Sequence, residues 1–569
     1  MNKECQNCKT IFEVTAEDQQ FYTKVGVPPP TWCPDCRQQR RYAWRNERTL
    51  YRRKCDLCGK STVTIYSPNK PYKVYCPPCW WGDGWDARNF GRDFDFNRPF
   101  FEQFKELQLQ VPRIALLGKN STNSEYSNHS SDNKNCYLVT SCVESENIMY
   151  SNWIMGSRDT MDGLYVYDKL ERSYECIDSR NSYRCQFGFW LRDCNECFYC
   201  YDCHGCTNCF LSTNLRNRSY CFLNQQYSKE EYLKKVAEFK LGSFADREKL
   251  YQKYLELMQA GALHRFVMNE NSVNVVGSTV SNSRNAYRCF DVDDVENSRY
   301  CISALHFKDS MDSYHFGFKT ELAYEAHALI RNYFTRFCHL SYDDSYITYC
   351  DTCHNSQNLF GCVGVNKGEY LVFNKQYSKE EYTALMEKII EHMKKTKEFG
   401  EFFPIEMSPF GYNETQGNVY MPLTKEQVLA KGWKWEDTAP GTFGKETITA
   451  ENLPDDIKDV GEEILSAVLK CISCSRNYNV VKPELDFYKR ENVPIPRRCY
   501  DCRYMRRIKL RSPRNLWHRT CMCDYAAYPN TVKHPHHTDG TCPNEFETCY
   551  APDRKEIVYC EQCYNAEVV

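Results

Sequence analysis

The chain has 569 residues, of which 42% are hydrophobic and 26% are charged, a balance typical of soluble globular proteins and not of long disordered chains. Its formal net charge of −2 neither favours nor excludes a polyanionic partner. No apolar run approaches the roughly 20 residues that a bilayer-spanning helix needs, and Cys5 and Cys8 lie where a signal peptide would need its charged and apolar regions. We therefore expect a cytoplasmic protein without a membrane partner, whose 35 cysteines stay reduced.

The first 81 residues contain four C-x2-C pairs. The eight cysteines are Cys5, Cys8, Cys33, Cys36, Cys55, Cys58, Cys76 and Cys79. Zn²⁺ takes four thiolates in a tetrahedron, and each C-x2-C turn supplies two of them. A closed four-cysteine site leaves no coordination position for water, so such zinc stabilises a fold and does no chemistry. We interpret residues 1–81 as tandem zinc ribbons and residues 82–118 as a connector.

An arginine-rich segment follows Cys36 and reads "RQQRRYAWRNERTLYRRK", with eight basic residues against one acid. If this segment is helical, its basic stripe falls within roughly 80° of arc. The stripe consists of Arg37, Arg41, Arg45, Arg48 and Arg52. Because arginine binds phosphates bidentately, the stripe suggests nucleic-acid binding, and RNA is favoured because nothing in the pattern suggests a helix shaped to read a DNA groove. The alternative is that these arginines pair with acids of the central region.

The central region is duplicated without a gap at an offset of 150, residues 130–232 against 280–382. Within each copy Asn or Asp followed by an aromatic residue or cysteine recurs about every 12 residues, as at Asn135 and Asn147. Repeats this short must stack to bury a core, which predicts parallel β-solenoid halves at 119–227 and 267–377. Helical segments are expected at 228–266 and 378–400, each with Ser before "KEE" as its N-cap.

The first copy contains "CNECFYCYDCHGCTNC", with a cysteine at every third position from Cys194 to Cys209. Four of these six cysteines are replaced in the second copy, by Asp344, Ile347, Ser356 and Leu359. Packed positions tolerate such exchanges and a metal cluster does not, so most of the six should be structural. A C-x-x-C-H motif is retained in both copies, which leaves an extra metal ion or haem as minority interpretations. Its residues are Cys200, Cys203, His204, Cys350, Cys353 and His354.

After a connector at 401–470, the segment from Cys471 repeats the first 55 residues at an offset of 466. It supplies a third zinc site of Cys471, Cys474, Cys499 and Cys502. The fourth site is irregular, and we expect Cys521, Cys523, Cys560 and Cys563. An insertion with His534, His536, His537 and Cys542 could add a ligand to it. The second basic stripe is Arg503, Arg507, Arg511 and Arg514, on a helix that Pro513 should end.

The motifs "CQNC" to "CPDCRQQRR", with "FYTKVGVPPP" between them, resemble the zinc-ribbon domain of uncharacterised bacterial proteins. The C-terminal "CYDCRYMRR" and "IVYCEQCYNAEVV" resemble the end of a larger family built in the same way, which would cover most of the chain. The resemblance implies zinc and a fold but no activity. The C-x-C at Cys521 departs from the ribbon pattern.

The expected fold is mixed and mainly β, with a duplicated parallel β-solenoid-like centre, helical insertions, and four-cysteine modules at 1–81 and 471–569 that bind about four Zn²⁺ ions. Zinc-dependent RNA binding is the first functional hypothesis. A non-enzymatic protein scaffold with zinc modules as caps is the alternative. A carbohydrate-active enzyme would use acids retained in both copies and is the least favoured. These acids are Asp159, Asp162, Glu171, Glu175 and Asp193, with Asp309, Asp312, Glu321, Glu325 and Asp343.

Overall fold

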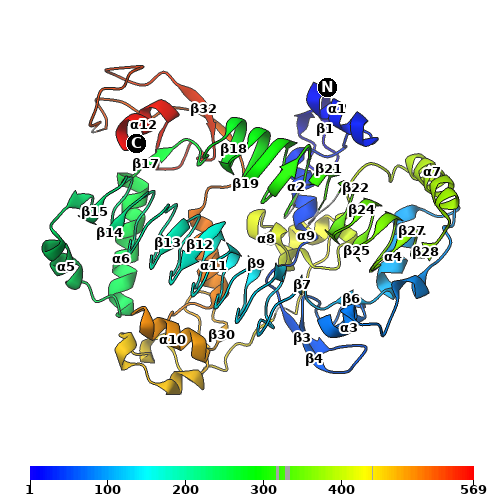
Figure 1. The fold of residues 1–569 in the computed structure, drawn as a ribbon, viewed down its shortest axis with the longest axis horizontal. Coiled ribbons are helices and arrows are strands. Elements are labelled where there is room, and N and C mark those ends of the chain that lie inside the picture. The colour runs from blue at the N-terminus through cyan, green and yellow to red at the C-terminus, as the bar shows by residue number, and fades with distance from the viewer. Residues whose placement is uncertain (316–319, 327–332, 439, 529) are drawn as a thin grey trace. The chain divides into compact units, whose positions relative to one another are not determined.

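The computed structural model describes residues 1–315, 320–326, 333–438, 440–528 and 530–569 (Figure 1). The chain forms two compact units, and each combines a terminal zinc-binding segment with one central copy. Unit 1 contains residues 1–116 and 267–439, and unit 2 contains residues 117–266 and 440–569. The N-terminal cysteine modules therefore belong to the same unit as the second central copy, and the C-terminal modules belong with the first.

The first central copy is a ladder of short parallel strands, which we call stack A (residues 117–227, cyan to green in Figure 1). Its strands are β7 (Gly118–Lys119), β8 (Ser130–Ser131), β9 (Thr140–Val143), β10 (Asn152–Met155), β11 (Leu164–Val166), β12 (Asp168–Glu171), β13 (Arg180–Tyr183), β14 (Thr207–Phe210) and β15 (Ser219–Phe222). Thr140 pairs with Asn152, and Asn152 pairs with Leu164, so the register advances by one 12-residue step per strand. Isolated parallel bridges carry this register through the segments between β13 and β14.

The backbone of stack A enters the left-handed region at every third residue over long stretches. Glu196, Tyr199 and Asp202 have φ of 51°, 55° and 51°. Left-handed geometry is unfavourable for most side chains but tolerated by Asn and Asp, which explains the Asn and Asp rhythm in the sequence. Asn135 and Asn147, with φ of 55° and 56°, also join in a side-chain ladder in which Asn135 Nδ2 donates to Asn147 Oδ1 at 3.1 Å.

The residues that follow the left-handed positions form the narrow core of stack A. The six cysteines from Cys194 to Cys209 are all at most 2% exposed and belong to one buried cluster. Their thiols behave as small hydrogen-bond donors, since Cys200 Sγ lies 3.4 Å from the carbonyl oxygen of Phe198 and 3.5 Å from that of Cys209. Burial raises the pKa of Cys200 and Cys203 well above the ordinary thiol value. Cys200 and Cys203 therefore pack the core as protonated thiols.

The second central copy forms the equivalent stack B (residues 267–377) in unit 1. Its nine-stranded sheet consists of β18 (Val273–Ser281), β19 (Arg284–Arg299), β20 (Leu305–Lys308), β21 (Thr320–Tyr324), β22 (Tyr333–Arg336), β24 (Ser345–Thr348), β26 (Gln357–Phe360), β27 (Glu369–Val372) and β28 (Lys375–Gln376). A separate parallel pair is made by β23 (His339–Tyr342) and β25 (Asp351–His354). The strands are parallel except for the final β27–β28 hairpin.

Each stack ends in a hairpin, and the helix expected from the repeated "KEE" segment follows it. In stack A, β15 pairs antiparallel with β16 (Gln225–Gln226), and α5 (Lys229–Ala237) and α6 (Phe244–Glu256) follow. In stack B the helix is α7 (Lys379–Lys395). Ser228 and Ser378 each cap their helix reciprocally with a Glu three residues later, which confirms the predicted N-caps.

The connectors of unit 1 are ordered and contain helices, some of which were not predicted from the sequence. Helix α4 (Phe100–Gln110) packs Phe100 and Phe104 against Phe373 of stack B. In the later connector, α8 (Gln416–Tyr420) precedes α9 (Lys425–Ala430). Helix α9 has Thr424 as its N-cap, and the chain turns at Gly432 with φ of 73° after the helix. Among the residues that the structure describes, no helix has both the length and the apolar character needed to span a membrane.

Candidate metal centres

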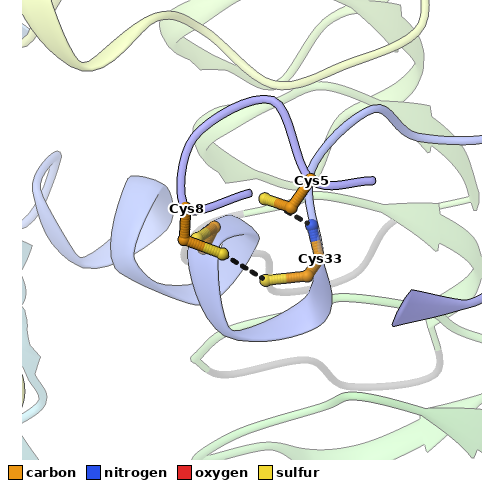
Figure 2. A group of neighbouring side chains, drawn as sticks. Cys5, Cys8 and Cys33 are labelled. Atoms are coloured by element: carbon orange, nitrogen blue, oxygen red, sulfur yellow. Dashed lines mark hydrogen bonds between the residues drawn. The ribbon is translucent and has the colours of Figure 1, made fainter. Parts of the chain in front are cut away.

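Module 1 (residues 1–44) brings its four cysteines together around one point. Cys5 and Cys8 lie in the turn between β1 (Asn2–Glu4) and β2 (Ile11–Glu13), before α1 (Ala16–Val25). Cys33 is the N-cap of α2 (Pro34–Tyr42), which carries Cys36 in its first turn. Figure 2 shows Cys8 Sγ facing Cys33 Sγ at 3.8 Å, and the Cys33 amide donating to Cys5 Sγ at 3.2 Å. Two Zn²⁺ ligands with 2.3 Å bonds in a tetrahedron stand about 3.8 Å apart, so the geometry fits zinc.

Modules 2 and 3 repeat this arrangement at residues 51–81 and 469–510. Module 2 consists of β3 (Tyr51–Lys54), β4 (Ser61–Thr64), β5 (Val74–Tyr75) and α3 (Pro77–Trp81). Module 3 consists of β29 (Leu469–Lys470), β30 (Asn477–Tyr478), α10 (Lys482–Arg490) and α11 (Tyr500–Leu510). The sulfur atoms of Cys58 and Cys76 are 3.8 Å apart, and those of Cys474 and Cys499 are 3.7 Å apart. Both predicted ligand sets gather within 4.8 Å.

One thiol of a coupled pair in modules 1 and 3 has a lowered pKa, whereas the pKa of its partner, Cys36 or Cys499, is raised. A hydrogen bond with Cys36 lowers the pKa of Cys33 to about 5, and one with Cys499 lowers the pKa of Cys471 to about 4. The second cysteine pair of each module also lies at a helix N-terminus, where the backbone dipole favours negative charge. All these cysteines are free of disulfides. The modules therefore have the donor type, spacing and charge that zinc requires.

Module 4 (residues 517–569) corrects the predicted fourth ligand set. It consists of β31 (Trp517–Thr520), β32 (Glu545–Thr548), β33 (Ile557–Tyr559) and α12 (Glu561–Val568). The four-cysteine group contains Cys542 in place of Cys523, together with Cys521, Cys560 and Cys563. Cys542 Sγ lies 3.9 Å from Cys560 Sγ, and the Cys560 amide donates to Cys521 Sγ at 3.1 Å. The C-x-C spacing misled the prediction because Cys523 faces the histidines of the insertion instead.

A sequence signal for Cys542 existed. Cys58 stands three residues before Ser61, where β4 begins, and Cys542 stands three residues before Glu545, where β32 begins. Module 4 aligns with module 2 without a gap from Cys542 onward, because Cys560 and Cys563 then fall on Cys76 and Cys79. An alignment that instead starts from Cys55 and Cys521 pairs Cys58 with Cys523 and so misses Cys542.

In the retained C-x-x-C-H motifs the cysteines point into the core of each stack, whereas the histidines lie outside that core. Cys200, Cys203, Cys350 and Cys353 are 0% exposed. Cys203 Sγ donates to the carbonyl of Tyr201 at 3.5 Å, and burial raises the pKa of Cys353 to about 11. His204 instead lies near Asp202, with Nε2 3.3 Å from Oδ1. The ring of His354 packs against Trp81 with centroids 5.0 Å apart. The geometry of these described residues supports packing roles.

The first arginine stripe is not a continuous helix, because α2 ends at Tyr42 and Arg52 lies in β3. Arg37, Arg41 and Arg45 are at most 1% exposed, whereas Arg52 is exposed and Arg48 is half-buried. Arg37 Nε lies 2.9 Å from Asp312 Oδ2, and Arg41 Nη1 lies 3.2 Å from Oδ1 of the same carboxylate. Three members of the predicted nucleic-acid surface are thus buried against stack B and cannot reach a phosphate in this structure.

A buried glutamate extends this first interface. Arg40, which the predicted stripe did not include, places Nη2 2.6 Å from Glu325 Oε1. Its Nη1 lies 2.7 Å from Glu401 Oε2. The Glu325 carboxylate is 0% exposed, so its charge is balanced by arginine and not by water. Two acids that the sequence offered to an enzyme, Asp312 and Glu325, are therefore structural partners of α2.

The second stripe makes the same contacts in unit 2. Arg503 Nε lies 2.9 Å from Asp162 Oδ2, and Arg507 Nη2 lies 2.8 Å from Oδ1 of that carboxylate. Arg511 Nε pairs with Asp178 Oδ2 at 2.8 Å, while Arg514 follows Pro513, beyond the end of α11 as predicted. Arg503 and Arg507 are 2% and 1% exposed. These two residues are therefore buried in an interface, and the prediction that they contact a nucleic acid is wrong for them too.

The central contacts of the two interfaces are equivalent through both duplications, although Arg511 pairs with Asp178 whereas its equivalent Arg45 pairs with Glu47. Arg37 and Arg503 are equivalent, as are Asp312 and Asp162, and both arginines also lie over equivalent tyrosines, Tyr300 at 5.4 Å and Tyr150 at 4.8 Å from the ring centroid. Arg506, the equivalent of Arg40, meets Glu175 at 2.9 Å, as Arg40 meets Glu325. The side chain of Glu321 lies outside the described residues.

The comparisons with known proteins concern mainly module 1. Residues 1–44 match a family model described as "Probable treble clef domain". This match agrees with the knuckle between β1 and β2 and with a helix that supplies the second cysteine pair, so module 1 is similar to a treble clef domain. Together with the four-cysteine groups, the match supports zinc binding.

Other comparisons add no function. No curated protein matches the chain. One solved structure, a "putative acetyltransferase" from Desulfovibrio desulfuricans G20, is 11% identical, and the match covers 46% of this chain and 71% of that one. Its TM-score of 0.09 carries no argument about fold or activity.

Proposed function

We propose that this protein is a non-enzymatic scaffold, in which zinc modules are fixed onto two parallel β-solenoids that present their outer faces to other proteins. The observation that carries the proposal is the buried arginine–carboxylate interface of each unit. It removes from solvent most of the arginines that favoured RNA, although Arg48 and Arg52 stay accessible, and it also buries acids that favoured an enzyme, namely Asp162, Glu175, Asp312 and Glu325. Truncating one partner of such a buried pair is strongly destabilising, which suits a permanent attachment.

The outer face of each stack carries a row of exposed charges of alternating sign. In stack A, Glu146 lies 2.8 Å from both Lys134 Nζ and Arg158 Nη2. In stack B, Arg284 and Glu296, the residues equivalent to Lys134 and Glu146, are 2.6 Å apart. Alternating charges offer no continuous positive field to a nucleic acid, but they can be complementary to the mixed surface of a protein.

The residues of stack A around this row line an open groove of about 580 Å³. Charged side chains of both signs line it, including Lys134, Glu144, Arg158, Lys169 and Glu171. Small-molecule sites are predominantly apolar, so this groove better suits the polar rim of a protein interface.

The proposal is tested by purifying the protein from its own cells after nuclease treatment, with and without the double change Lys134→Glu and Arg158→Glu. The wild type should retain defined protein partners, and the double variant should lose them, because both positive charges of the row are reversed. Lys234→Glu, an exposed charge on α5 outside the row, is the matched control and should retain them. Element analysis and circular dichroism should be unchanged in all three proteins, since exposed ion pairs contribute at most about 1 kcal/mol.

RNA binding is measured on the same samples across a salt series. The scaffold proposal expects no salt-sensitive binding to mixed RNA at micromolar protein concentration. Salt-sensitive RNA binding together with partners that nuclease removes would instead favour the nucleic-acid hypothesis. Partners that are unaffected by the double reversal would disprove the role of the charged row.

A further inference from the structure

The insertion of module 4 gathers a second set of metal-ligand side chains beside the fourth zinc site. Cys523, His534, His537 and Cys563 place one ligand atom each within 4.8 Å of all the others. Cys563 is also a member of the four-cysteine group with Cys521, Cys542 and Cys560. We propose that module 4 binds two Zn²⁺ ions bridged by the Cys563 thiolate, the second one held by Cys523, His534 and His537.

The distances within the second set fit a tetrahedral ion. Cys523 Sγ is 3.5 Å from His534 Nδ1, and Cys563 Sγ is 3.4 Å from His537 Nε2. Zinc bonds of about 2.3 Å to sulfur and about 2.0 Å to nitrogen place such ligand atoms about 3.5 Å apart. Two cysteines and two histidines are a common ligand set for structural zinc. The four donors therefore have the type and separation of a closed site.

Groups outside the ligand set hold the histidines in orientation. His534 is 0% exposed, and its Nε2, the nitrogen not facing Cys523, lies 2.9 Å from Glu567 Oε1. Glu567 also accepts the amides of Thr531 and Val532, so one carboxylate fixes the insertion backbone and the imidazole together. His537 Nδ1 lies 3.4 Å from the carbonyl of Asp539. Carboxylate and carbonyl partners of this kind orient zinc-bound histidines through their second nitrogen.

Charge also favours a second ion. Four thiolates around a single Zn²⁺ carry a formal charge of about −2, and a second Zn²⁺ with the Cys523 thiolate and two neutral histidines lowers its magnitude to about −1. The cysteines concerned are buried, so uncompensated charge would be costly. A bridging thiolate donates two lone pairs, one to each ion, and the S–H bond of Cys523 is broken when the second ion binds, its proton passing to solvent.

His536 lies next to both proposed ligand sets but is a member of neither. Its Nε2 lies 3.3 Å from both Cys542 Sγ and Cys563 Sγ. We assign it as a hydrogen-bond donor to these thiolates, which supports the first ion of the pair without binding the second. It supplies the matched control for the ligand variants.

The proposal is tested by element analysis of the full-length protein. Wild type should hold about five zinc ions, and Cys523→Ser or Cys542→Ser should each hold about four. Cys563→Ser should hold about three because it serves both ions, and His536→Asn should hold about five. Glu567→Gln should weaken the last ion to bind, by roughly tenfold to a hundredfold in chelator competition.

Cobalt substitution separates loss of the second ion from general misfolding. Two Co²⁺ ions joined by one thiolate couple antiferromagnetically, so the low-temperature paramagnetic resonance of the fully loaded wild type should correspond to about three isolated ions. In Cys523→Ser the signal should rise to about four although the protein has lost an ion. A wild-type count of four zinc ions, a Cys523→Ser count equal to wild type, an ion lost in His536→Asn, or a cobalt signal that falls in Cys523→Ser would overturn the proposal.

Discussion

At the scale of single residues, the decisive contacts are buried ion pairs between arginines next to a metal site and acids within a stack. Asp312 is 0% exposed and faces both Arg37 and Arg41. Asp162 has the same position between Arg503 and Arg507. An arginine fork can pair with a carboxylate in a fixed geometry that lysine cannot reproduce, which explains why arginine occupies these positions.

The first prediction concerns Asp312→Asn. It removes the carboxylate that faces Arg37 and leaves Arg41 with only Glu325 at 3.9 Å, and we expect a loss of roughly 3–5 kcal/mol in the stability of unit 1. The loss is measured as a lowered urea midpoint followed by a signal from unit 1. Glu146→Gln, which breaks an exposed pair, is the control and should cost at most about 1 kcal/mol. Equal effects of the two changes would contradict the structural role of Asp312.

A second prediction concerns acid stability and His339 in β23. Burial lowers the pKa of His339 to about 4, although Asp351 lies 3.8 Å from its Nε2. Its ordinary pKa is about 6.5, so the unfolded chain binds this proton first. His339 therefore costs stability as pH falls from about 6.5 to 4, by about 3 kcal/mol in total.

His339→Gln should remove this part of the pH dependence. The stability difference between the variant and wild type, measured by urea unfolding at a series of pH values, should shift in favour of the variant as pH falls through this range. Zinc loss in acid affects both proteins and cancels in the comparison. A difference that stays constant with pH would show that the pKa of His339 is the same in the folded and unfolded chain, against this prediction. The exposed His306, changed to Gln, is the control.

At the scale of elements, the left-handed residues and the small inward side chains together define a stack. A core this narrow accepts Cys, Ser, Val, Ile or Leu, and so the cysteine run requires no metal. Stack B demonstrates this, because Ile347 and Leu359 are 0% exposed at the positions equivalent to Cys197 and Cys209. Cysteine and aliphatic residues exchange there because both fill the same buried column.

The third prediction follows for Cys197→Ile and Cys209→Leu. Both replacements occur naturally in the other stack, so each should cost less than about 1.5 kcal/mol in unit 2 and leave the zinc content unchanged. Urea unfolding and element analysis measure the two quantities. Cys203→Phe is the contrasting variant, since overpacking of the column should cost more. Loss of zinc from either conservative variant would reveal the central cysteines as ligands.

At the scale of the whole molecule, the chain interleaves its two duplications. The N-terminal modules share unit 1 with stack B, and the C-terminal modules share unit 2 with stack A. Each unit thus joins segments that are far apart in sequence, and its integrity depends on a zinc module at one end of the chain.

The fourth prediction uses this arrangement. Cys33→Ser should remove one zinc ion, unfold module 1 and release its arginines from stack B. Hydrogen–deuterium exchange should then increase in 267–377 more than in 117–227. Cys499→Ser should give the opposite pattern, because module 3 belongs to unit 2. Exchange that rises in the stack nearer in sequence to the mutated module would contradict the observed units.

Local features of this protein were determined by the sequence alone. The C-x2-C pairs, the helix caps at Ser228 and Ser378, and the 12-residue spacing all concern residues close to one another, so short-range geometry decides them. The internal duplication even identified Cys197 and Cys209 as packing residues. What only the tertiary structure decided are the pairings across hundreds of residues.

The arginines of α2 and the acids of stack B were both visible in the sequence, but each was assigned a separate role. Arg37 and Asp312 are 275 positions apart, and no local pattern shows that they neutralise each other. Cys542 was considered only as a possible additional ligand for a related reason, since an insertion separates it from Cys521 and chain folding brings the two together. Spacing determines contacts within one turn or strand, whereas a contact across a long loop depends on burial and charge balance in the complete fold.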